Sequence, residues 1–150
     1  MNVPLLLLAA ATLATAAPAW AQAPAQASRA YTEGPVVDMS YIKTKPGMFD
    51  RYMQYLNGDY RKSLESQKAA GLVLGYTIYT SAARTPQDHD IILAVTYKNW
   101  GALDNLADRA DAVANRTFGN TPGQRDQQFI DRAAMRDVLG GRTYQQLILK

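Results

Sequence analysis

The chain contains no cysteine, which excludes disulfide bonds, thiol catalysis and thiolate metal ligands. It has a single histidine, His89, so no second imidazole is available for a nitrogen-rich metal site. No Ser-His-Asp order, glycine-rich phosphate loop or zinc-ligand spacing is present. These absences argue against hydrolase, kinase and nucleotide-binding functions, and we expect neither a metal nor a cofactor.

The chain also lacks a run of charges of one sign. Its 16 basic and 13 acidic residues are interspersed, which leaves a formal net charge of only +3. A nucleic-acid-binding surface normally gathers lysine and arginine on one face or along one helix. We therefore expect no nucleic-acid partner.

The N-terminal segment has the pattern of an export signal. An apolar run from Leu5 to Ala17 is followed by Ala19-Trp20-Ala21, which places small residues as a signal peptidase requires. Because a membrane span needs roughly 20 apolar residues, this run is too short to be a stable anchor. We predict a signal peptide over residues 1–21, cleaved near Ala21, and a periplasmic or secreted protein without membrane insertion after cleavage.

After the predicted cleavage site, residues 22–34 are rich in alanine, glutamine, proline and serine and show no apolar period. This composition predicts a flexible linker. Residues 35–150 then form one domain, which is long enough to bury a core without disulfides or metals.

Hydrophobic periodicity changes along this domain between the period of a strand and that of a helix. Asn99 is expected to cap one helix, and Thr121 with Gln124 to form a capping box for another that ends at Gly140-Gly141. The predicted strands are residues 36–43, 72–80, 90–97 and 143–149, and the predicted helices are residues 48–70, 100–118 and 122–139. Gly58 in the first helix is expected to permit a close helix–sheet approach, and the last helix is expected to bury Phe129, Ile130, Ala133 and Val138.

The resulting order is β-α-β-β-α-(α)-β. This order predicts an α+β, ferredoxin-like fold with a four-stranded antiparallel sheet and helices on one face. One strand face is consistently apolar and is expected to lie under the helices: Met39, Tyr41, Leu74, Tyr76, Ile78, Ile91, Leu93, Val95, Leu147 and Leu149. The opposite face is mixed: Asp38, Ser40, Ile42, Val73, Gly75, Thr77, Tyr79, Ile92, Ala94, Thr96, Tyr144, Gln146 and Ile148.

The mixed face is too apolar for full solvation and too polar for an ordinary core. A second copy of the chain would cover it and leave a cavity lined by polar groups. We therefore predict a homodimer in which two sheets face each other around a pocket.

Four segments carry a resemblance to a known superfamily: Lys43–Met48, Thr85–Leu93, Tyr97–Trp100 and Leu147–Lys150. Over residues 35–150 the chain resembles small exported bacterial proteins of the dimeric α+β-barrel superfamily. The resemblance implies a ferredoxin-like fold and a pocket between helices and sheet or inside the barrel. The superfamily includes cofactor-free monooxygenases, haem-degrading enzymes, chlorite dismutase-like proteins, muconolactone isomerases and non-catalytic ligand-binding members.

No residue here matches a catalytic motif of these enzymatic branches. A haem branch would require a proximal histidine on a helix, and none of the predicted helices contains one. The leading hypothesis is therefore a non-catalytic domain that binds a small apolar or aromatic molecule. The mixed face supplies its candidate ligand-binding residues, Ser40, Thr77, Tyr79 and Tyr144.

Two residues are weak catalytic candidates. Asp38 is the one acid assigned to the mixed face, and His89 lies between Asp88 and Asp90 at the start of a strand. Either can take a proton from a substrate, as a cofactor-independent monooxygenase or isomerase requires. The third hypothesis is a structural or partner-binding module, which predicts a filled barrel without a cavity.

Overall fold

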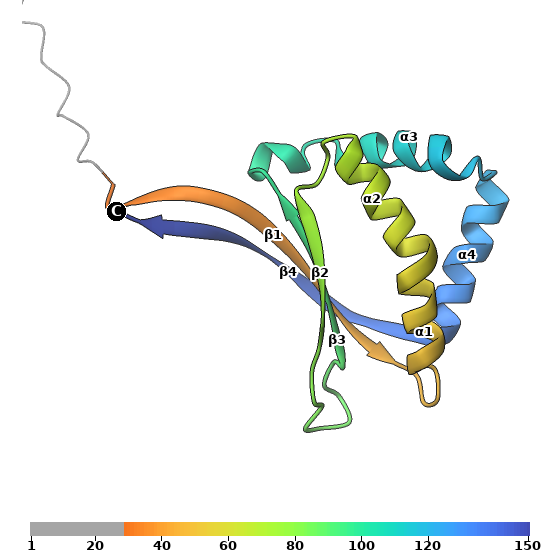
Figure 1. The fold of residues 1–150 in the computed structure, drawn as a ribbon. Helices are drawn as coiled ribbons and strands as arrows, with labels where there is room; N and C mark the ends of the chain where they lie inside the picture. The colour runs from red at the N-terminus through yellow and green to blue at the C-terminus, as the bar shows by residue number, and fades with distance from the viewer. Residues whose placement is uncertain (1–28) are drawn as a thin grey trace, which may run out of the picture.

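The computed structural model describes residues 29–150. Its four strands form one sheet in the order β2-β3-β1-β4, and every neighbouring pair is antiparallel. With the helices on one side of the sheet (Figure 1), this confirms the predicted ferredoxin-like α+β fold. The elements are β1 (Tyr31–Thr44), α1 (Phe49–Tyr55), the π-helical turn η1 (Leu56–Tyr60), α2 (Arg61–Ala69), β2 (Gly75–Thr80), β3 (Ile91–Tyr97), the 3-10 helix η2 (Trp100–Leu103), α3 (Leu106–Phe118), α4 (Pro122–Met135) and β4 (Arg136–Leu149).

The core lies between the sheet and the continuous helical segment α1–η1–α2. One cluster joins Ile42 of β1 and Ile91 of β3 to Tyr52 and Leu56 of the helices, and all four side chains are fully buried. A second cluster surrounds Val36 at the other end of β1. Burying each of these side chains contributes about 1.5–3 kcal/mol, so the two clusters carry most of the hydrophobic stabilisation.

The core corrects the predicted orientation of β1. Val36 and Ile42 are buried under the helices, so the residues at even positions, including Asp38 and Ser40, face the helices. Met39 and Tyr41 face the opposite side, contrary to the sequence-based assignment. The predicted orientations of Tyr76 to Thr80 and of β3 are confirmed, because Ile78, Ile91 and Leu93 pack in the first core cluster. Just before β2 the prediction is wrong, because Val73 is buried beside Val36 and Leu74 is half exposed.

The C-terminal boundary also differs from the prediction. α4 ends at Met135, and β4 begins directly at Arg136. Gly140 and Gly141 therefore lie inside a strand instead of ending a helix. Val138 was predicted to be buried in the helix, but its side chain is exposed in β4, and the α4 residues Phe129, Ile130 and Ala133 are also exposed.

The glycines adapt β4 to its neighbour. Gly140 has a φ of +139°, next to the register shift between Tyr41 and Ile42 in the β1–β4 pairing. A Cβ at Gly141 would lie 2.7 Å from the carbonyl oxygen of Met39. Glycine at these two positions therefore permits a bulge and a close approach of the two backbones.

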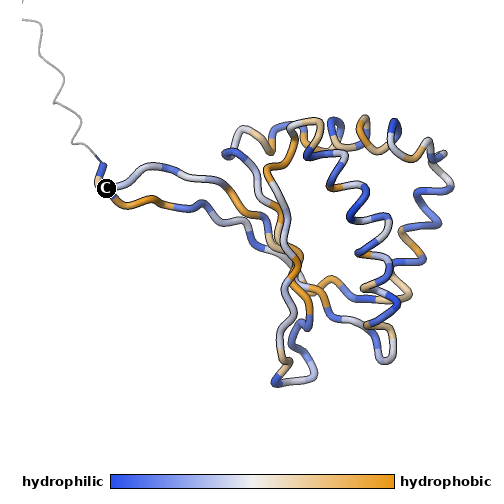
Figure 2. The backbone as a smooth tube through the Cα atoms, viewed as in Figure 1, coloured by the Kyte–Doolittle hydropathy of each residue, from blue (hydrophilic) through white to orange (hydrophobic). Residues whose placement is uncertain are grey.

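β1 and β4 extend as a two-stranded arm beyond the other strands (Figure 1). Residues 31–34, predicted to belong to the linker, form the start of this arm. Leu147 and Leu149 were expected under the helices but lie in the arm with exposed side chains, and Figure 2 shows the hydrophobic colouring of this end of β4. We use the name arm for residues 31–33 paired with residues 147–149.

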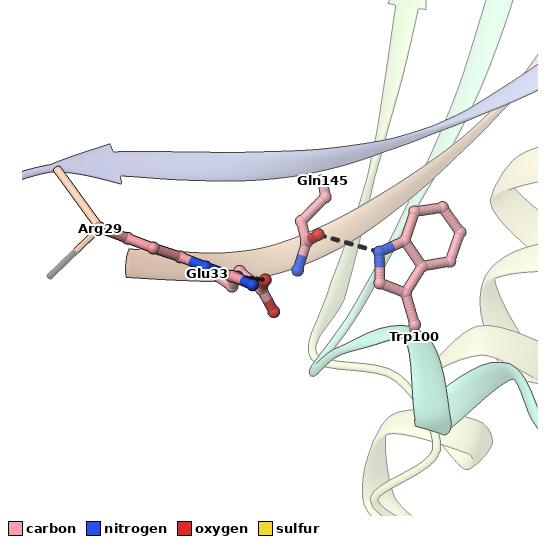
Figure 3. A network of polar contacts seen from close by, with 4 residues as sticks. All are labelled: Arg29, Glu33, Trp100 and Gln145. Atoms are coloured by element: carbon pink, nitrogen blue, oxygen red, sulfur yellow. Dashed lines mark hydrogen bonds and ion pairs between the residues drawn. The ribbon is translucent and has the colours of Figure 1, made fainter. Parts of the chain in front are cut away.

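A side-chain hydrogen bond joins the base of the arm to the body. The indole Nε1 of Trp100 in η2 donates to Oε1 of Gln145 at 2.9 Å, as Figure 3 shows. Arg29 pairs with Glu33 along the arm at 2.9 Å, but both side chains are more than half exposed. Such a surface pair contributes at most about 1 kcal/mol, so it does little to fix the arm.

Two predicted helix caps are confirmed and one expectation is not. Asn99 accepts from the backbone N–H of Ala102, and Thr121 with Gln124 forms the capping box of α4. Gly58 was considered a site of close helix–sheet approach, but it is exposed and interrupts the helix with the π-helical turn η1. A Cβ at this position would meet no atom within 4 Å.

Candidate functional site

The uncovered side of the sheet is the candidate site, and we call it the open face. Its residues alternate along the strands with those that face the helices, and Figure 1 shows the helices on the opposite side. The open face consists of Val37, Met39 and Tyr41 of β1, Gly75, Thr77 and Tyr79 of β2, Ile92, Ala94 and Thr96 of β3, and Arg142 and Tyr144 of β4. It is a mixed surface of apolar, hydroxyl-bearing and aromatic side chains, as predicted for the face that a second copy would cover.

Two tyrosines and the single histidine form a cluster on this face. The hydroxyl oxygens of Tyr41 and Tyr144 lie 3.1 Å apart and share a hydrogen bond across β1 and β4. The ring of Tyr41 also contacts the ring of His89, with a centroid distance of 4.9 Å and an angle of 45° between the planes. The cluster therefore presents two hydroxyl groups and one imidazole side by side.

The hydrogen bond with Tyr144 is the main reason why the pKa of Tyr41 is raised above 10.0. Partial desolvation raises it further, and the nearby Arg142 opposes the shift. In this pair one hydroxyl donates and the other accepts, so one hydroxyl proton remains that can be donated to a ligand.

His89 is held in place by the two acids beside it. Asp88 closes the preceding loop by accepting from the backbone N–H groups of Arg84 and Thr85, at 2.8 and 2.9 Å. These contacts lower the pKa of Asp88 below 3.8, and the backbone hydrogen bond from Thr85 has the largest effect. Asp90 accepts from the backbone N–H of Thr44 at 3.0 Å, which ties the other side of His89 to β1. Backbone N–H groups therefore donate to both flanking acids, and these hydrogen bonds fix the chain on either side of His89.

The predicted site residues are divided between the two faces. Thr77, Tyr79 and Tyr144 lie on the open face as expected, and His89 joins them through Tyr41. Asp38 and Ser40 lie on the helix side of β1 instead, because the orientation of this strand was predicted incorrectly. Three of the four predicted ligand-binding residues therefore lie on the open face, and Ser40 does not. Asp38 and His89 lie on opposite sides of the sheet.

Asp38 has its own partners on the helix side. Its Oδ1 accepts from the Thr143 hydroxyl of β4 at 2.7 Å. Burial, followed by the charge of Asp38, raises the pKa of the Tyr97 hydroxyl. The Asp38 carboxylate thus accepts its hydrogen bond from Thr143 of the neighbouring strand. Within residues 29–150, neither Ser40, Thr77 nor an arginine donates to it.

The buried tyrosines between sheet and helices are poor acid–base groups. Burial raises the pKa of Tyr52 to about 12 and that of Tyr60 above its usual range. The Tyr52 hydroxyl is fully buried and has no hydrogen-bond partner among residues 29–150. Tyr52 belongs to the first core cluster, and Tyr60 packs against that cluster.

Sequence reasoning missed Tyr41, which is the central residue of the cluster. The polar pair Asp38 and Ser40 in the middle of β1 made the odd positions look like the buried set. The useful signal was at the ends of the strand, where the β-branched residues Val36 and Ile42 share the even phase.

The described part of the chain holds neither a metal-binding cluster nor a membrane-spanning helix. No group of three or more histidine, cysteine, aspartate or glutamate side chains is placed to hold a metal ion within residues 29–150. In the same range, no helix is long and apolar enough to cross a membrane. The predicted signal peptide and most of the linker lie outside the described residues.

Comparison with known proteins identifies the fold without identifying an activity. HapK from Hahella chejuensis matches with a TM-score of 0.50 at 12% identity, over 74% of this chain and 91% of HapK. A dimeric ferredoxin-like protein from an uncultured marine organism matches with a TM-score of 0.47 at 11% identity, over 79% of this chain and 98% of that protein. No protein-family model matches the chain, and no curated protein matches it. The similarity to HapK establishes the fold alone.

Proposed function

We propose that the protein is a non-catalytic homodimer that binds a small apolar or aromatic molecule between two open faces. The observation that carries this proposal is the cluster of Tyr41, Tyr144 and His89 on the sheet face opposite the helices of residues 29–150. Aromatic rings supply apolar contact area, and their polar groups orient a ligand. Thr77 and Tyr79 extend the same surface across β2.

The dimer is supported by apolar side chains that one copy leaves in water. Leu147, Ile148 and Leu149 of the arm are 53%, 48% and 81% exposed. The arm continues the β1–β4 ribbon that borders the open face (Figure 1), so one partner can cover both surfaces. Contiguous exposed apolar residues of this kind mark protein–protein contacts, and a two-fold dimer is the commonest solution for identical chains.

Replacing Leu147 and Leu149 with aspartate tests this assembly. Charges at the arm would have to be desolvated in the interface, so we expect the double variant to be monomeric in light scattering where the wild type is dimeric. Ala112→Asp places a charge on an exposed residue of α3 and should leave the dimer unchanged. A wild-type protein that is monomeric at micromolar concentration would disprove the dimer.

Ligand binding is tested by native mass spectrometry and by thermal shift with a library of aromatic and apolar compounds. We expect a compound that raises the melting temperature of the wild type and has a weaker effect on Tyr41→Phe. Asp38→Asn should respond as the wild type does, because Asp38 lies on the other side of the sheet. Failure of every compound in a dimeric protein would favour the structural or partner-binding module.

A cofactor-independent monooxygenase or isomerase is the second candidate. It is favoured by the contact between the rings of His89 and Tyr41, which places an imidazole on the side of the sheet where a substrate would bind. Oxygen consumption with hydroxylated aromatic substrates should then be lost in His89→Gln and retained in Asp38→Asn. If the wild type consumes no oxygen and isomerises none of these substrates, this candidate is eliminated.

Export to the periplasm or the medium is the third part of the proposal. Its support is the apolar run from Leu5 to Ala17 and the Ala19-Trp20-Ala21 sequence. N-terminal sequencing of the protein recovered outside the cytoplasm should begin at Gln22 or close to it. Recovery of the intact N-terminus from the cytoplasm would contradict export.

A further inference from the structure

A cavity of about 320 Å³ lies where α4, the start of β4 and the end of β1 meet. Its charged lining residues are Lys45, Arg132, Arg136 and Asp137. Val138 shares its orientation with Ile42, to which it is paired, so the cavity lies on the helix side of the sheet. It is therefore separate from the open face and independent of the function proposed above.

The cavity has an excess of positive charge. Its only carboxylate, that of Asp137, lies 3.9 Å from Nζ of Lys45, and both side chains are substantially exposed. Arg132 and Arg136 form no ion pair and no side-chain hydrogen bond within residues 29–150. Two guanidinium groups thus remain available to an anion.

Aromatic rings hold these two guanidinium groups in place. Arg136 lies over the ring of the buried Tyr52, at 5.4 Å from its centroid. Arg132 lies over Phe129 and over Tyr55, at 5.8 Å from each centroid. Stacking engages the flat faces of the guanidinium groups and leaves their N–H edges free to donate to a carboxylate.

The rest of the lining is apolar and exposed. Phe129 and Val138 are 65% and 59% exposed, although the sequence pattern predicted both to be buried. Ala133 completes this wall between them. An apolar tail covering these side chains would remove them from water, at about 25 cal/mol for each Å² covered.

We infer that this cavity binds a free carboxylate that carries a short apolar tail, such as a medium-chain or aryl-substituted acid. The carboxylate lies between Arg132 and Arg136, where guanidinium groups donate paired hydrogen bonds to its oxygens. The tail packs on Phe129 and Val138. A free molecule is favoured over a bilayer surface because cations and apolar side chains line the same small cavity.

Three ligands with the same tail and different heads test this site: octanoate, octanol and octylammonium. Titration calorimetry of the full chain should give the tightest binding for octanoate, with affinity that falls as salt is added. Arg132→Gln should weaken octanoate binding about tenfold or more, because a charge-assisted hydrogen bond is lost. Lys68→Gln removes the same charge from the exposed end of α2 and should leave the affinity unchanged.

A second variant guards against loss of folding. Val138→Asp lies at an exposed position and adds a carboxylate to the cavity, so it should abolish octanoate binding while unfolding by urea remains cooperative. Tyr144→Phe, on the open face, should bind octanoate as the wild type does, which separates this site from the proposed function.

Three outcomes would overturn the inference. They are octanoate binding no tighter than octylammonium or octanol, equal losses in Arg132→Gln and Lys68→Gln, or no octanoate binding. Binding to phosphatidylglycerol vesicles in the absence of octanoate binding would assign the cations to a lipid surface and would also overturn it.

Discussion

The segment from β1 to β3 and the segment from α4 to β4 differ in how they bury apolar side chains. From β1 to β3 with α1 and α2, large apolar residues are mostly buried against each other. From α4 to β4, Met135 is the one buried apolar residue, and eight of the twelve large exposed apolar side chains of the described residues lie there. The first region is a completed core, whereas the second has surfaces that only another molecule can cover.

The difference follows from the position of β4 in the sheet. β4 has 14 residues, twice as many as β3, but it lies at the sheet edge and pairs with β1 alone. A long edge strand exposes its second edge and part of both faces, and proteins normally cover or charge such an edge. Apolar residues retained at this position therefore indicate a partner, which we propose is a second copy at the arm and a small carboxylate at the cavity.

Truncating the core should have the largest effect. Leu56→Ala is expected to lower the free energy of unfolding by about 2–5 kcal/mol, because it leaves a cavity under the sheet. Leu149→Ala in the arm should change it by less than about 0.5 kcal/mol in dilute protein, since the side chain is exposed. Urea unfolding measures both values.

As protein concentration rises, Leu149→Ala should lower the free energy of unfolding by a larger amount, because the proposed dimer buries Leu149. A similar cost for both variants in dilute protein would remove the contrast between the two regions.

Glycine replacements test how closely β4 approaches β1. Gly141→Ala should cost about 1–3 kcal/mol, because its Cβ would lie 2.7 Å from the Met39 carbonyl oxygen and would push the strands apart. Gly75→Ala in β2 is the matched control, since its Cβ meets no atom within 4 Å. The control should leave stability unchanged or raise it by up to about 1 kcal/mol. Equal effects in thermal unfolding would show that the β1–β4 approach is not tight.

Removing the Tyr52 hydroxyl should stabilise the core region. The hydroxyl is buried without a partner among the described residues, so Tyr52→Phe is expected to raise stability by about 1 kcal/mol at neutral pH. Because burial raises the pKa of Tyr52 from 10.0 to about 12, folding favours its protonated form. This pKa difference adds to the free energy of unfolding. The added stability is complete below pH 10.0 and is lost as pH rises toward about 12.

Urea unfolding across this pH range provides the check. The wild type should lose stability more steeply than Tyr52→Phe, in which this group cannot ionise. Parallel curves would show that Tyr52 does not titrate differently in the folded and unfolded states.

The smallest predicted effect is on the open face. Tyr144→Phe removes the hydrogen bond that is the main cause of the raised pKa of Tyr41, so this pKa should fall toward 10.0. Tyrosinate absorbance in a pH titration measures the shift. Tyr79→Phe changes the same face without removing this hydrogen bond and should leave Tyr41 unaffected, and an identical result for both variants would contradict the cluster.

The sequence predicts the fold better than the site because the two depend on different information. Alternation and capping residues such as Asn99 and Thr121 are local, and they were sufficient for the order of elements and for the sheet with helices on one face. The phase of β1 depends on which of two similar faces meets the helices. Val36 and Ile42 place the even positions on the helix side, and Asp38 is accommodated there because the hydroxyl of Thr143, distant in sequence, donates to its carboxylate.

The boundary between α4 and β4 was mispredicted for a similar reason. Gly140 and Gly141 resemble a helix stop, but they serve a bulge and a close strand approach that depend on Met39 and Tyr41. Phe129 and Val138 continue an apolar period that normally indicates burial, yet both line an open cavity. The apolar pattern did not mark burial in the chain's own core, and we propose that a ligand's apolar tail covers these two side chains instead.

The most direct test is sedimentation equilibrium of the wild-type protein over a range of concentrations from nanomolar to tens of micromolar. We predict a reversible monomer–dimer equilibrium, with a mass twice that of one chain at the upper end and a shift toward monomer when Leu147 and Leu149 are replaced with aspartate. A single-chain mass at every concentration, unchanged by these replacements, would show that a second copy does not cover the exposed segment from α4 to β4.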